Sequence, residues 1–475
     1  MSRRWPVIGG RSSCNPICSL RTSTSARRWR ARKTGTRPWR RCAPPSGLRP
    51  TASEAHLEIG RVLTQLQRHH DALTAYEQAL ELAPELVQAY VYQAVTLFEI
   101  KHYQLARLSA AAAIELDTNS AVAYYNRGLA YSRLNRCQEG LRDNLRAIEL
   151  QPDYADAHWN TALNCLLLGD YAAGWRHYEW RWRRTGAGPQ HYAERPLWTG
   201  SESLAGKTIL LHAEQGIGDT IQFSRYVPMV AARGARVLLE VYPAVAPLFT
   251  RLPGVAEILI RGEQDSTATF DYQAPLLTLP LAFGTTMESI PTDSPYLHPH
   301  PSRLRQWREI LGARTHPRIG LSWSGNPSHR HDQERSIPLA QLASLLIPDG
   351  EFFSLQRDVR PEDKAVLAEH EELRHFGEQL RDFSHTAALI AHMDLVISVD
   401  TAVAHLAGAM GKPTWVLLPF HPDWRWLLER HDSPWYPSLR VFRQPLRDDW
   451  ATVLQQVAQA LGDALASAIR ETPHD

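Results

Sequence analysis

The sequence has few cysteines and no long apolar run, and each shortage excludes a class of protein. Only five of the 475 residues are cysteine and none form a CxxC pair, so neither a disulfide framework nor a zinc site is expected. No apolar run approaches the roughly 18 residues that a membrane-spanning helix needs. We therefore expect a protein of the reducing cytoplasm without a transmembrane segment.

Acidic residues are missing from one part of the chain. Residues 1–50 hold twelve arginines and one lysine but no aspartate or glutamate. This is the composition of a transit peptide or a nucleic-acid arm, but nothing downstream requires import, and we expect a disordered tail or a wrongly placed start of translation. The remaining residues carry 39 basic and 50 acidic groups, so the folded body is acidic and nucleic acid is not expected as its partner.

The chain contains an internal sequence repeat with a period of 34 residues. The tetrapeptide "ALEL" begins at Ala79, and "AIEL" begins at Ala113 and again at Ala147. Gly60 recurs two periods later as Gly128. Small residues at fixed positions let two helices approach closely, and this pattern resembles the tetratricopeptide repeat, a helix–turn–helix unit. The expected repeats, the last of them degraded, are 53–86, 87–120, 121–154 and 155–188.

Repeats of this kind form a concave surface that binds peptides or partner proteins. We expect the repeats to recruit a partner, with homodimerisation or a scaffolding role as the alternative. The aromatic and arginine cluster at 175–184, with Trp175, Trp180 and Trp182, is expected to cover apolar surface at the seam with the next domain.

Short apolar runs alternate with helical stretches after the "ERPLWTG" linker. Strands that alternate with helices predict parallel sheets, and two series of them predict two doubly wound domains. The fold class is thus α + α/β, a helical solenoid followed by two Rossmann-like domains. The predicted strand runs are 208–212, 236–242, 255–260, 318–325, 351–356, 394–400 and 413–419. The expected parts are a tail (1–50), the repeats (51–186), a first Rossmann-like domain (187–312) and a second (313–475).

Polar motifs follow the predicted strands at their carboxyl ends, where such folds bind ligands. These motifs are "EQGIGD" in the first half and "SWSGNP" and "SVDTAVAHLAGAMG" in the second. In the last, the N–H groups of Thr401 and Ala402 open a helix and form an anion site, with His405 one turn further on the same face. A helix cap and a satisfied helix histidine are the alternative.

Here a second resemblance becomes specific. The stretches "LLHAEQGIGDTIQF", "NPSHRHDQERSIPL", "DTAVAHLAGA" and "PFHPDWRWLL" resemble the family 9, heptosyltransferase-like glycosyltransferases. With the repeats, the resemblance extends from about residue 53 to the end. It implies the GT-B pair of Rossmann halves and transfer of a sugar from a nucleotide donor, with inversion and without a bound metal or other cofactor.

The resemblance also implies roles for individual residues. The donor diphosphate would lie at Asp400, Thr401 and Ala402, where the heptosyltransferases usually have glycine at the third position, so ADP-heptose is not assigned as the donor. Arg335 would be the family's basic residue of the second half, and Asp219 its acidic residue in the first-half glycine-rich loop.

General chemistry agrees with these roles. Sugar transfer needs an acceptor hydroxyl that loses a proton and a diphosphate leaving group that is stabilised. Asp219 can accept the proton, while Arg335 and the helix behind Thr401 stabilise the diphosphate. The helix dipole lowers the pKa of Asp219, and closure of the domains is expected to desolvate the carboxylate and raise its pKa. A simple helix cap at Asp219 is the alternative.

Further residues complete the expected site. Gly216 and Gly218 suit a sharp turn with its backbone close to a ligand. Ser324 and Asn326 follow the first strand of the second half and join the donor site, and Gln356 either bonds a ribose or caps a strand end.

Two groups are expected to lie outside the chemistry. His329, His331 and Asp332 form a polar lid rather than a metal site, and no Asp-x-Asp pair favours a metal elsewhere. Trp424 and Trp426 are expected in the core, although either can stack on a base or a sugar.

These observations predict a glycosyltransferase with a nucleotide-sugar donor and a protein or glycan acceptor that is docked by the repeats. The alternative is a scaffold that carries an inactive transferase fold. The Gly-Asp turn and the Asp-Thr turn favour the enzyme, because a scaffold has no use for them.

Overall fold

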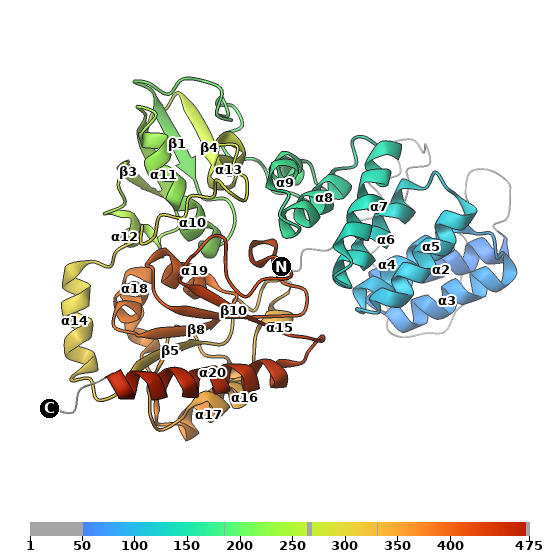
Figure 1. Cartoon of the computed structure of the whole chain (residues 1–475). Helices are drawn as coiled ribbons and strands as arrows, with labels where there is room; N and C mark the ends of the chain where they lie inside the picture. Colours follow the sequence, from blue (N-terminus) through green and yellow to red (C-terminus); the bar gives the residue numbers. More distant parts are fainter. Residues whose placement is uncertain (1–50, 185, 264–267, 330, 472–475) are drawn as a thin grey trace, which may run out of the picture. The chain divides into compact units, whose positions relative to one another are not determined.

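The computed structural model describes residues 51–184, 186–263, 268–329 and 331–471 (Figure 1). The predicted tail, 1–50, lies outside these residues. The chain forms two compact units. One holds the repeats up to Tyr131 with Arg142–Ala157 and Arg183–Gly188, and the other holds Ser132–Leu141, His158–Trp182 and the chain from Pro189 onward.

The first part of the chain is built from helix pairs at the predicted spacing. The first helix begins after Thr51, whose hydroxyl accepts a hydrogen bond from the Glu54 N–H while the Glu54 carboxylate accepts one from the Thr51 N–H. The pairs are α2 (Ala52–Gln65) with α3 (His69–Leu82), α4 (Val87–Glu99) with α5 (Tyr103–Leu116), α6 (Ala121–Arg133) with α7 (Cys137–Leu150), and α8 (Ala155–Leu167) with α9 (Tyr171–Tyr178).

The small residues of the repeat lie where two helices meet. A Cβ atom on Gly60 would lie 2.4 Å from the Tyr76 ring, so only glycine lets α2 and α3 approach this closely. Ala79, Ala113 and Ala147, one in each repeat, are fully buried. The close helix packing predicted from the 34-residue period is therefore confirmed.

The second unit contains two parallel sheets, which define a first lobe and a second lobe. The first-lobe sheet has the order β3-β2-β1-β4 and the second-lobe sheet the order β10-β9-β8-β5-β6-β7. Both chain orders run outward from a central strand in two directions, as in doubly wound folds. The first-lobe strands are β1 (Thr208–His212), β2 (Arg236–Val241), β3 (Val255–Ile260) and β4 (Tyr272–Pro275). The second-lobe strands are β5 (Arg318–Ser322), β6 (Glu351–Ser354), β7 (Leu373–His375), β8 (Leu395–Val399), β9 (Thr414–Leu418) and β10 (Leu439–Arg443).

Helices connect these strands and cover the sheets (Figure 1). In the first lobe they are α10 (Ile217–Phe223), η3 (Ser224–Tyr226), α11 (Val227–Ala231), α12 (Ala246–Phe249), η4 (Leu276–Thr278) and α13 (Leu279–Ala282). In the second they are α15 (Asp332–Arg335), α16 (Leu339–Leu342), η5 (Ala343–Leu345), α17 (Pro361–Glu369), η6 (Gly377–Gln379), α18 (Phe383–Ala391), α19 (Ala402–Ala409), η7 (Trp424–Trp426) and α20 (Trp450–Glu471). Helix α14 (Pro301–Leu311) packs against the second lobe, where Trp307 contacts Phe376 and His385. The short η2 (Glu179–Arg183) follows α9.

Every apolar run that predicted a strand forms one, and the fold class is confirmed. The prediction missed β4, β7 and β10. The "ERPLWTG" segment is not a simple linker. Leu197 pairs with Gln273 beside β4 and the Trp198 side chain is fully buried, so this segment is part of the first lobe.

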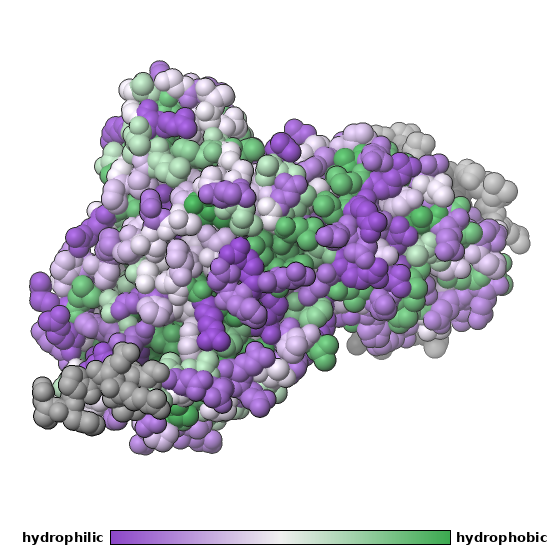
Figure 2. Space-filling view, viewed as in Figure 1, coloured by the Kyte–Doolittle hydropathy of each residue, from purple (hydrophilic) through white to green (hydrophobic). Residues whose placement is uncertain are grey.

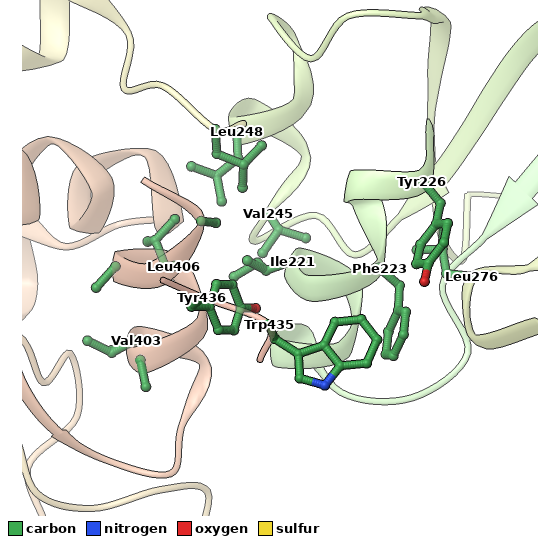
Figure 3. Packing of buried hydrophobic residues seen from close by; sticks show 14 of the residues in the cluster. Ile221, Phe223, Tyr226, Val245, Leu248, Leu276, Val403, Leu406, Trp435 and Tyr436 are labelled. Atoms are coloured by element: carbon green, nitrogen blue, oxygen red, sulfur yellow. The ribbon is translucent and has the colours of Figure 1, made fainter. Parts of the chain in front are cut away.

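The two lobes share one apolar core (Figure 3). Side chains from α10 and its neighbours face side chains from α19 and the segment before β10. The first lobe contributes Ile221, Phe223, Tyr226, Val245, Leu248 and Leu276, and the second contributes Val403, Leu406, Trp435 and Tyr436. Apolar packing thus holds the start of α10 against the start of α19.

Candidate functional site

The polar motifs of the second lobe lie at the centre of its sheet. β5 and β8 are neighbours, and their register pairs Ser322 with Ser398 near the carboxyl ends of both strands. The chain order of the sheet reverses between these two strands. Loops at such a switch point form the usual ligand crevice of a doubly wound sheet. The motifs after Ser322 and Ser398 therefore start from adjacent points, as predicted.

Arg335 contacts the turn after β8. It lies in α15, and its Nη1 donates a hydrogen bond to the Asp400 carbonyl oxygen at 2.8 Å. A Cβ atom on Gly325 would lie 2.5 Å from Arg335 Nη2, so a larger residue there would displace the guanidinium from its present position. The structure thus brings together two residues, Arg335 and Asp400, that sequence analysis placed in one site.

Helix α19 begins at this same turn. Thr401 is its N-cap, and its hydroxyl accepts a hydrogen bond from the Val403 N–H at 3.3 Å and lies 3.1 Å from the Ser398 hydroxyl. Thr401 and Ala402 are partly exposed, while the rest of α19 is buried. The positive end of an eight-residue helix therefore lies beside the Arg335 guanidinium.

The Asp400 side chain lies in a strongly charged environment. Burial and the nearby Asp423 carboxylate raise the pKa of Asp400 to about 6, while Arg335 and Arg425 oppose this shift. The Asp400 carboxylate lies 4.0 Å from His405 Nε2. Protonation of Asp400 near neutral pH is therefore accessible.

The first-lobe motif forms a sharp turn between β1 and α10. Gly216 is the N-cap of α10 and Asp219 is the third residue of the helix. Asp219 Oδ2 accepts a hydrogen bond from the Gly216 N–H at 2.7 Å. Asp219 thus closes the start of its own helix, as the capping alternative predicts, but this contact uses only one of its oxygens.

The glycines of this turn require a correction. A Cβ atom on Gly218 would lie 2.8 Å from His405 Cδ2 and 3.6 Å from the Ala402 Cα. The close approach at Gly218 is therefore to α19 of the second lobe, whereas sequence analysis expected an approach to a ligand. Gly216 is exposed and meets only the Asp219 carboxylate.

The residue that sequence analysis missed at this point is Arg425. Its guanidinium forms an ion pair with Asp219 of the first lobe and a second ion pair, at 2.9 Å, with Asp423. Its Nε also donates a hydrogen bond to the Gln222 side chain. Arg425 lies within the motif "HPDWRW". The sequence alone gives no means to pair it with Asp219, which lies 206 residues away.

Burial raises the pKa of the Asp219 carboxyl, and the Arg425 charge opposes that shift. The isolated helix dipole predicted a lowered pKa. The structure departs from this because the contact between the lobes desolvates Asp219, whose side chain is 19% exposed. The increase in pKa was predicted for the closed lobes.

The last helix pair supports the turn that carries Asp219. Arg181 binds both oxygens of Glu214, at 3.1 and 3.0 Å, and also the Glu179 carboxylate at 2.6 Å. The Tyr178 hydroxyl and the Gln215 side chain are within hydrogen-bonding distance of each other. Residues of α9 and η2 therefore fix the two residues that precede the Gly216 turn.

Two residues predicted to contact the donor make hydrogen bonds within the second lobe. Gln356 Oε1 accepts a hydrogen bond from the Ser322 hydroxyl at 2.8 Å, and its Nε2 donates one to the Ser324 hydroxyl at 2.9 Å. Both ends of the amide are satisfied inside the lobe, so the strand-end alternative is favoured over a ribose contact. Asn326 is exposed, and its carbonyl oxygen accepts hydrogen bonds from the Ser328 N–H and hydroxyl in a local turn.

His405 has a packing role in this structure. Its ring stacks on Trp426, its Nδ1 is 3.0 Å from the Tyr436 hydroxyl, and its edge faces Gly218. Burial and three nearby arginines hold the pKa of His405 well below its usual range, so the ring is neutral. The predicted phosphate contact of His405 is therefore not supported.

Asp332 and His331, which were expected in a polar lid, are held by contacts with arginines. The Asp332 carboxylate is buried and pairs with Arg360 and Arg335. His331 is 2.6 Å from Arg133 Nη2. No group of three metal-ligating side chains occurs among the residues that the structure describes.

The tryptophans lie in the core, as predicted. Trp424 and Trp426 are buried, and Trp424 meets Trp175 edge-on with ring centroids 5.2 Å apart. Trp175 also contacts Trp435 and Phe223. Of the expected aromatic seam, Trp175 therefore contacts both lobes, whereas Trp180 stacks on His158 of α8.

A second buried cation, Arg225, also escaped sequence analysis. Its Nη1 donates to the Pro291 and Trp435 carbonyl oxygens, both at 2.9 Å, and Nη2 donates to the Tyr296 hydroxyl at 3.2 Å. Arg225 therefore joins the lobes through backbone oxygens and aromatic faces.

Comparisons with known proteins support the predictions for both the repeats and the α/β part of the chain. Residues 53–86 and 125–174 match tetratricopeptide repeat families. Residues 380–442, which include Asp400, Thr401 and Arg425, match glycosyltransferase family 9 (heptosyltransferase). No helix among the described residues is both long and apolar enough to cross a membrane.

Individual relatives extend these matches. Protein FlbA of Caulobacter vibrioides is 28% identical over 447 residues, covering 88% of this chain and 74% of that protein. Putative lipopolysaccharide heptosyltransferase 4 of Escherichia coli is 46% identical over 57 residues, 12% of this chain and 13% of that protein.

Among solved structures, MamA of Desulfovibrio magneticus is 25% identical with a TM-score of 0.26, covering 27% of this chain and 72% of that one. By its family matches, the chain carries tetratricopeptide repeats in its N-terminal region and a glycosyltransferase family 9 (heptosyltransferase) domain in its C-terminal part.

Proposed function

We propose that the protein transfers a sugar from a nucleotide-sugar donor to a protein or glycan acceptor, with inversion and without a metal or other cofactor. One observation carries this proposal. The starts of α10 and α19, each at a strand end of its own lobe, meet at Gly218 and place Asp219 and the Asp400–Thr401 turn in one charged cluster. An acid and an anion site that face each other are what sugar transfer requires.

The donor diphosphate would bind at the start of α19. Arg335, held by the Asp400 carbonyl, and the N–H groups of Thr401 and Ala402 supply the positive charge that a departing diphosphate needs. These groups are present in the protein itself, which supports a mechanism that needs no metal. Ala402 keeps the close backbone approach that a phosphate requires.

Asp219 would accept the proton of the acceptor hydroxyl. Because its pKa is raised, Asp219 accepts a proton more readily than a carboxylate in water does. The acceptor hydroxyl then attacks the anomeric carbon and displaces the nucleoside diphosphate from the opposite face of the sugar. One bond forms between the acceptor oxygen and the anomeric carbon, and the bond to the diphosphate oxygen breaks.

The repeats would select or dock the acceptor. Tetratricopeptide repeats bind proteins, and the repeat helices here expose apolar side chains such as Leu105 and Leu108, which are about half exposed. Figure 2 shows hydrophobic and hydrophilic residues interspersed on the visible face of the molecule. Dimerisation through the repeats is the other use of this surface.

We propose the cytoplasm as the location of the protein.

A non-catalytic scaffold is the second candidate, and one observation favours it. Both oxygens of Asp219 already accept hydrogen bonds from the protein, one from Gly216 and one from Arg425. A carboxylate used only to join two lobes would show the same contacts. The two candidates differ in whether a nucleotide binds and turns over.

A nucleotide screen tests the proposal directly. The melting temperature of the full chain would be measured with ADP, UDP, GDP and CMP, since a ligand that binds the native state stabilises it by mass action. We expect one nucleotide to raise the melting temperature, and its sugar conjugate to be consumed when cell extract supplies acceptors. No stabilisation by any nucleotide and no consumption of a sugar conjugate would favour the scaffold.

A further inference from the structure

We propose that Arg425 and Asp423 are positioning residues for Asp219, which hold its carboxylate in place and tune its charge. This role rests on the proposed function, in which Asp219 is the general base. Arg425 and Asp423 belong to the second lobe and Asp219 to the first, so the arrangement exists only while the lobes are in contact.

The geometry fixes the guanidinium from several sides. Nη1 binds Asp423 Oδ1 at 2.9 Å, Nη2 binds Asp219 Oδ1, and Nε donates to the Gln222 side chain. The Trp424 ring lies 4.2 Å from Arg425 Cζ, which adds a cation–π contact. Because its planar fork is engaged on three sides, the guanidinium cannot rotate away from Asp219 without losing several contacts.

The Asp219 carboxylate is fixed in turn between two donors. The Gly216 N–H binds Oδ2 from within the first lobe, and Arg425 binds Oδ1 from the second. An ionised carboxylate has about four lone-pair sites, so two remain for the proton of an acceptor hydroxyl. A donor on each oxygen therefore orients the carboxylate without blocking proton uptake.

Charges from several elements surround Asp219, and they act in opposite directions. Arg425 and His329 lower the pKa of Asp219, whereas burial and Asp423 raise it. Glu214, Tyr178 and Tyr242 also interact with the Asp219 charge. Removal of Arg425 and removal of Asp423 should therefore shift the titration of Asp219 in opposite directions.

The pH dependence of turnover distinguishes tuning from mere structural support. Removal of an opposite charge within 4–6 Å raises a carboxyl pKa by about 1–3 units, so Arg425→Gln should move the acid limb of kcat/KM upward by about one pH unit or more. At a fixed pH below that limb, kcat/KM should fall about tenfold. Asp423→Asn should move the limb downward.

The experiment measures kcat/KM for the acceptor against pH at saturating donor, because Asp423 also acts on Asp400. Arg425→Lys keeps the charge and should restore the limb toward that of the unmodified protein. Arg430→Gln is the matched control, since Arg430 forms a more exposed ion pair with Asp432 nearby and should leave the limb unchanged. The proposal would be overturned if the acid limbs of the kcat/KM profiles of Arg425→Gln and Asp423→Asn moved in the same direction, or if neither limb moved.

A second measurement separates this inference from the proposed function. Carboxyl ¹³C chemical shifts of labelled aspartate, with the Asp219 signal assigned from Asp219→Asn, report the titration of Asp219 without turnover. The pKa of Asp219 read from this signal should shift in opposite directions in Arg425→Gln and Asp423→Asn. If it does so but Asp219→Asn remains fully active, the coupling stands and the base assignment fails. If Asp219→Asn is inactive but neither variant shifts the titration, the positioning role is wrong. Asp423→Asn keeps the cation in place and serves if Arg425→Gln fails to fold.

Discussion

The contact between the lobes depends at one position on the absence of a side chain. A Cβ on Gly218 would lie 2.8 Å from His405 Cδ2, and the ring cannot move cheaply because it stacks on Trp426 and bonds to Tyr436. Gly218→Ala should therefore destabilise the lobes by about 1–3 kcal/mol, the usual cost of overpacking, and lower turnover. Urea unfolding followed by tryptophan fluorescence measures this change.

Gly462→Ala is the control for that substitution. Gly462 lies inside α20, and an added Cβ would meet nothing within 4 Å. The alanine should leave stability unchanged or raise it by roughly 0.5–1 kcal/mol. If Gly218→Ala unfolds at the same urea concentration as the unmodified protein, the contact at Gly218 tolerates a side chain. The lobes would then separate at little cost, which contradicts the close contact described above.

At the donor site, Arg335→Ala removes the cation beside the Asp400–Thr401 turn. Charge-assisted hydrogen bonds contribute about 1.5–3 kcal/mol, so nucleotide affinity should fall about tenfold or more in a calorimetric titration. Thr401→Val removes the neighbouring hydroxyl at nearly constant volume and should cause a smaller loss. Arg314→Ala, which removes an exposed ion pair with Asp394, should have no effect. Unchanged affinity in both site variants would place the donor elsewhere.

The sequence predicts some of these residues and not others for a physical reason. Asp219 and Thr401 follow strands at places where doubly wound folds bind ligands, so local pattern predicts that they lie near a site. The roles expected of Asp219 and Arg335 come from the resemblance to the family 9 glycosyltransferases. The contacts of Arg425 depend on the packing of one lobe on the other. The interior position of Gln356 likewise depends on how the Ser322 and Ser324 side chains are satisfied, which no local pattern records.

At the level of elements, α9 and η2 hold the turn that carries Asp219. The buried Arg181–Glu214 ion pair makes this link, and the two side chains are only 5% and 2% exposed. Arg181→Met should destabilise the second unit by about 3–5 kcal/mol, because it leaves the Glu214 charge buried without its partner. Thermal or urea unfolding gives the free energy.

A double-mutant cycle isolates that interaction. Glu214→Gln combined with Arg181→Met should recover part of the loss, since the uncompensated charge is gone. Arg236→Met, which breaks an exposed pair with Glu257, should cost little. If the two core substitutions add without any recovery, the ion pair does not link these elements energetically.

The elements themselves follow from the sequence to different degrees. The 34-residue period predicts the helix pairs because Gly60 and the buried alanines recur wherever two helices cross. β1, β2 and β8 are predicted because buried parallel strands are continuous apolar runs. β7 has only three residues, and β4 contains Gln273 and Pro275, so neither carries a pattern that differs from a loop.

At the scale of the whole molecule, the repeats divide between the two compact units. Removal of residues 51–120, two complete helix pairs, should leave nucleotide affinity unchanged and reduce transfer of labelled sugar to endogenous acceptors, if the repeats dock the acceptor. Removal of residues 51–186 should instead reduce stability, because Trp175, Tyr178 and Arg181 are part of the second unit's core.

The two truncations test separate claims. Full transfer by a soluble chain that lacks residues 51–120 would contradict docking by the first repeats and favour dimerisation as their role. A chain that lacks residues 51–186 and unfolds like the full protein would contradict the account of the last helix pair. Solubility and the unfolding transition are measured first in both.

The central claim, that the contact between the lobes makes Asp219 the base of a sugar transfer, is tested most directly by the turnover of Asp219→Asn. Asparagine keeps the shape of the side chain and can still accept one of its two hydrogen bonds, so the melting temperature should fall by only about 2–4 °C and donor affinity should persist. Loss of a general base reduces turnover by about a hundredfold or more. We predict that loss with intact donor binding. Turnover close to that of the unmodified protein would contradict the account and leave Asp219 as a structural link between the lobes.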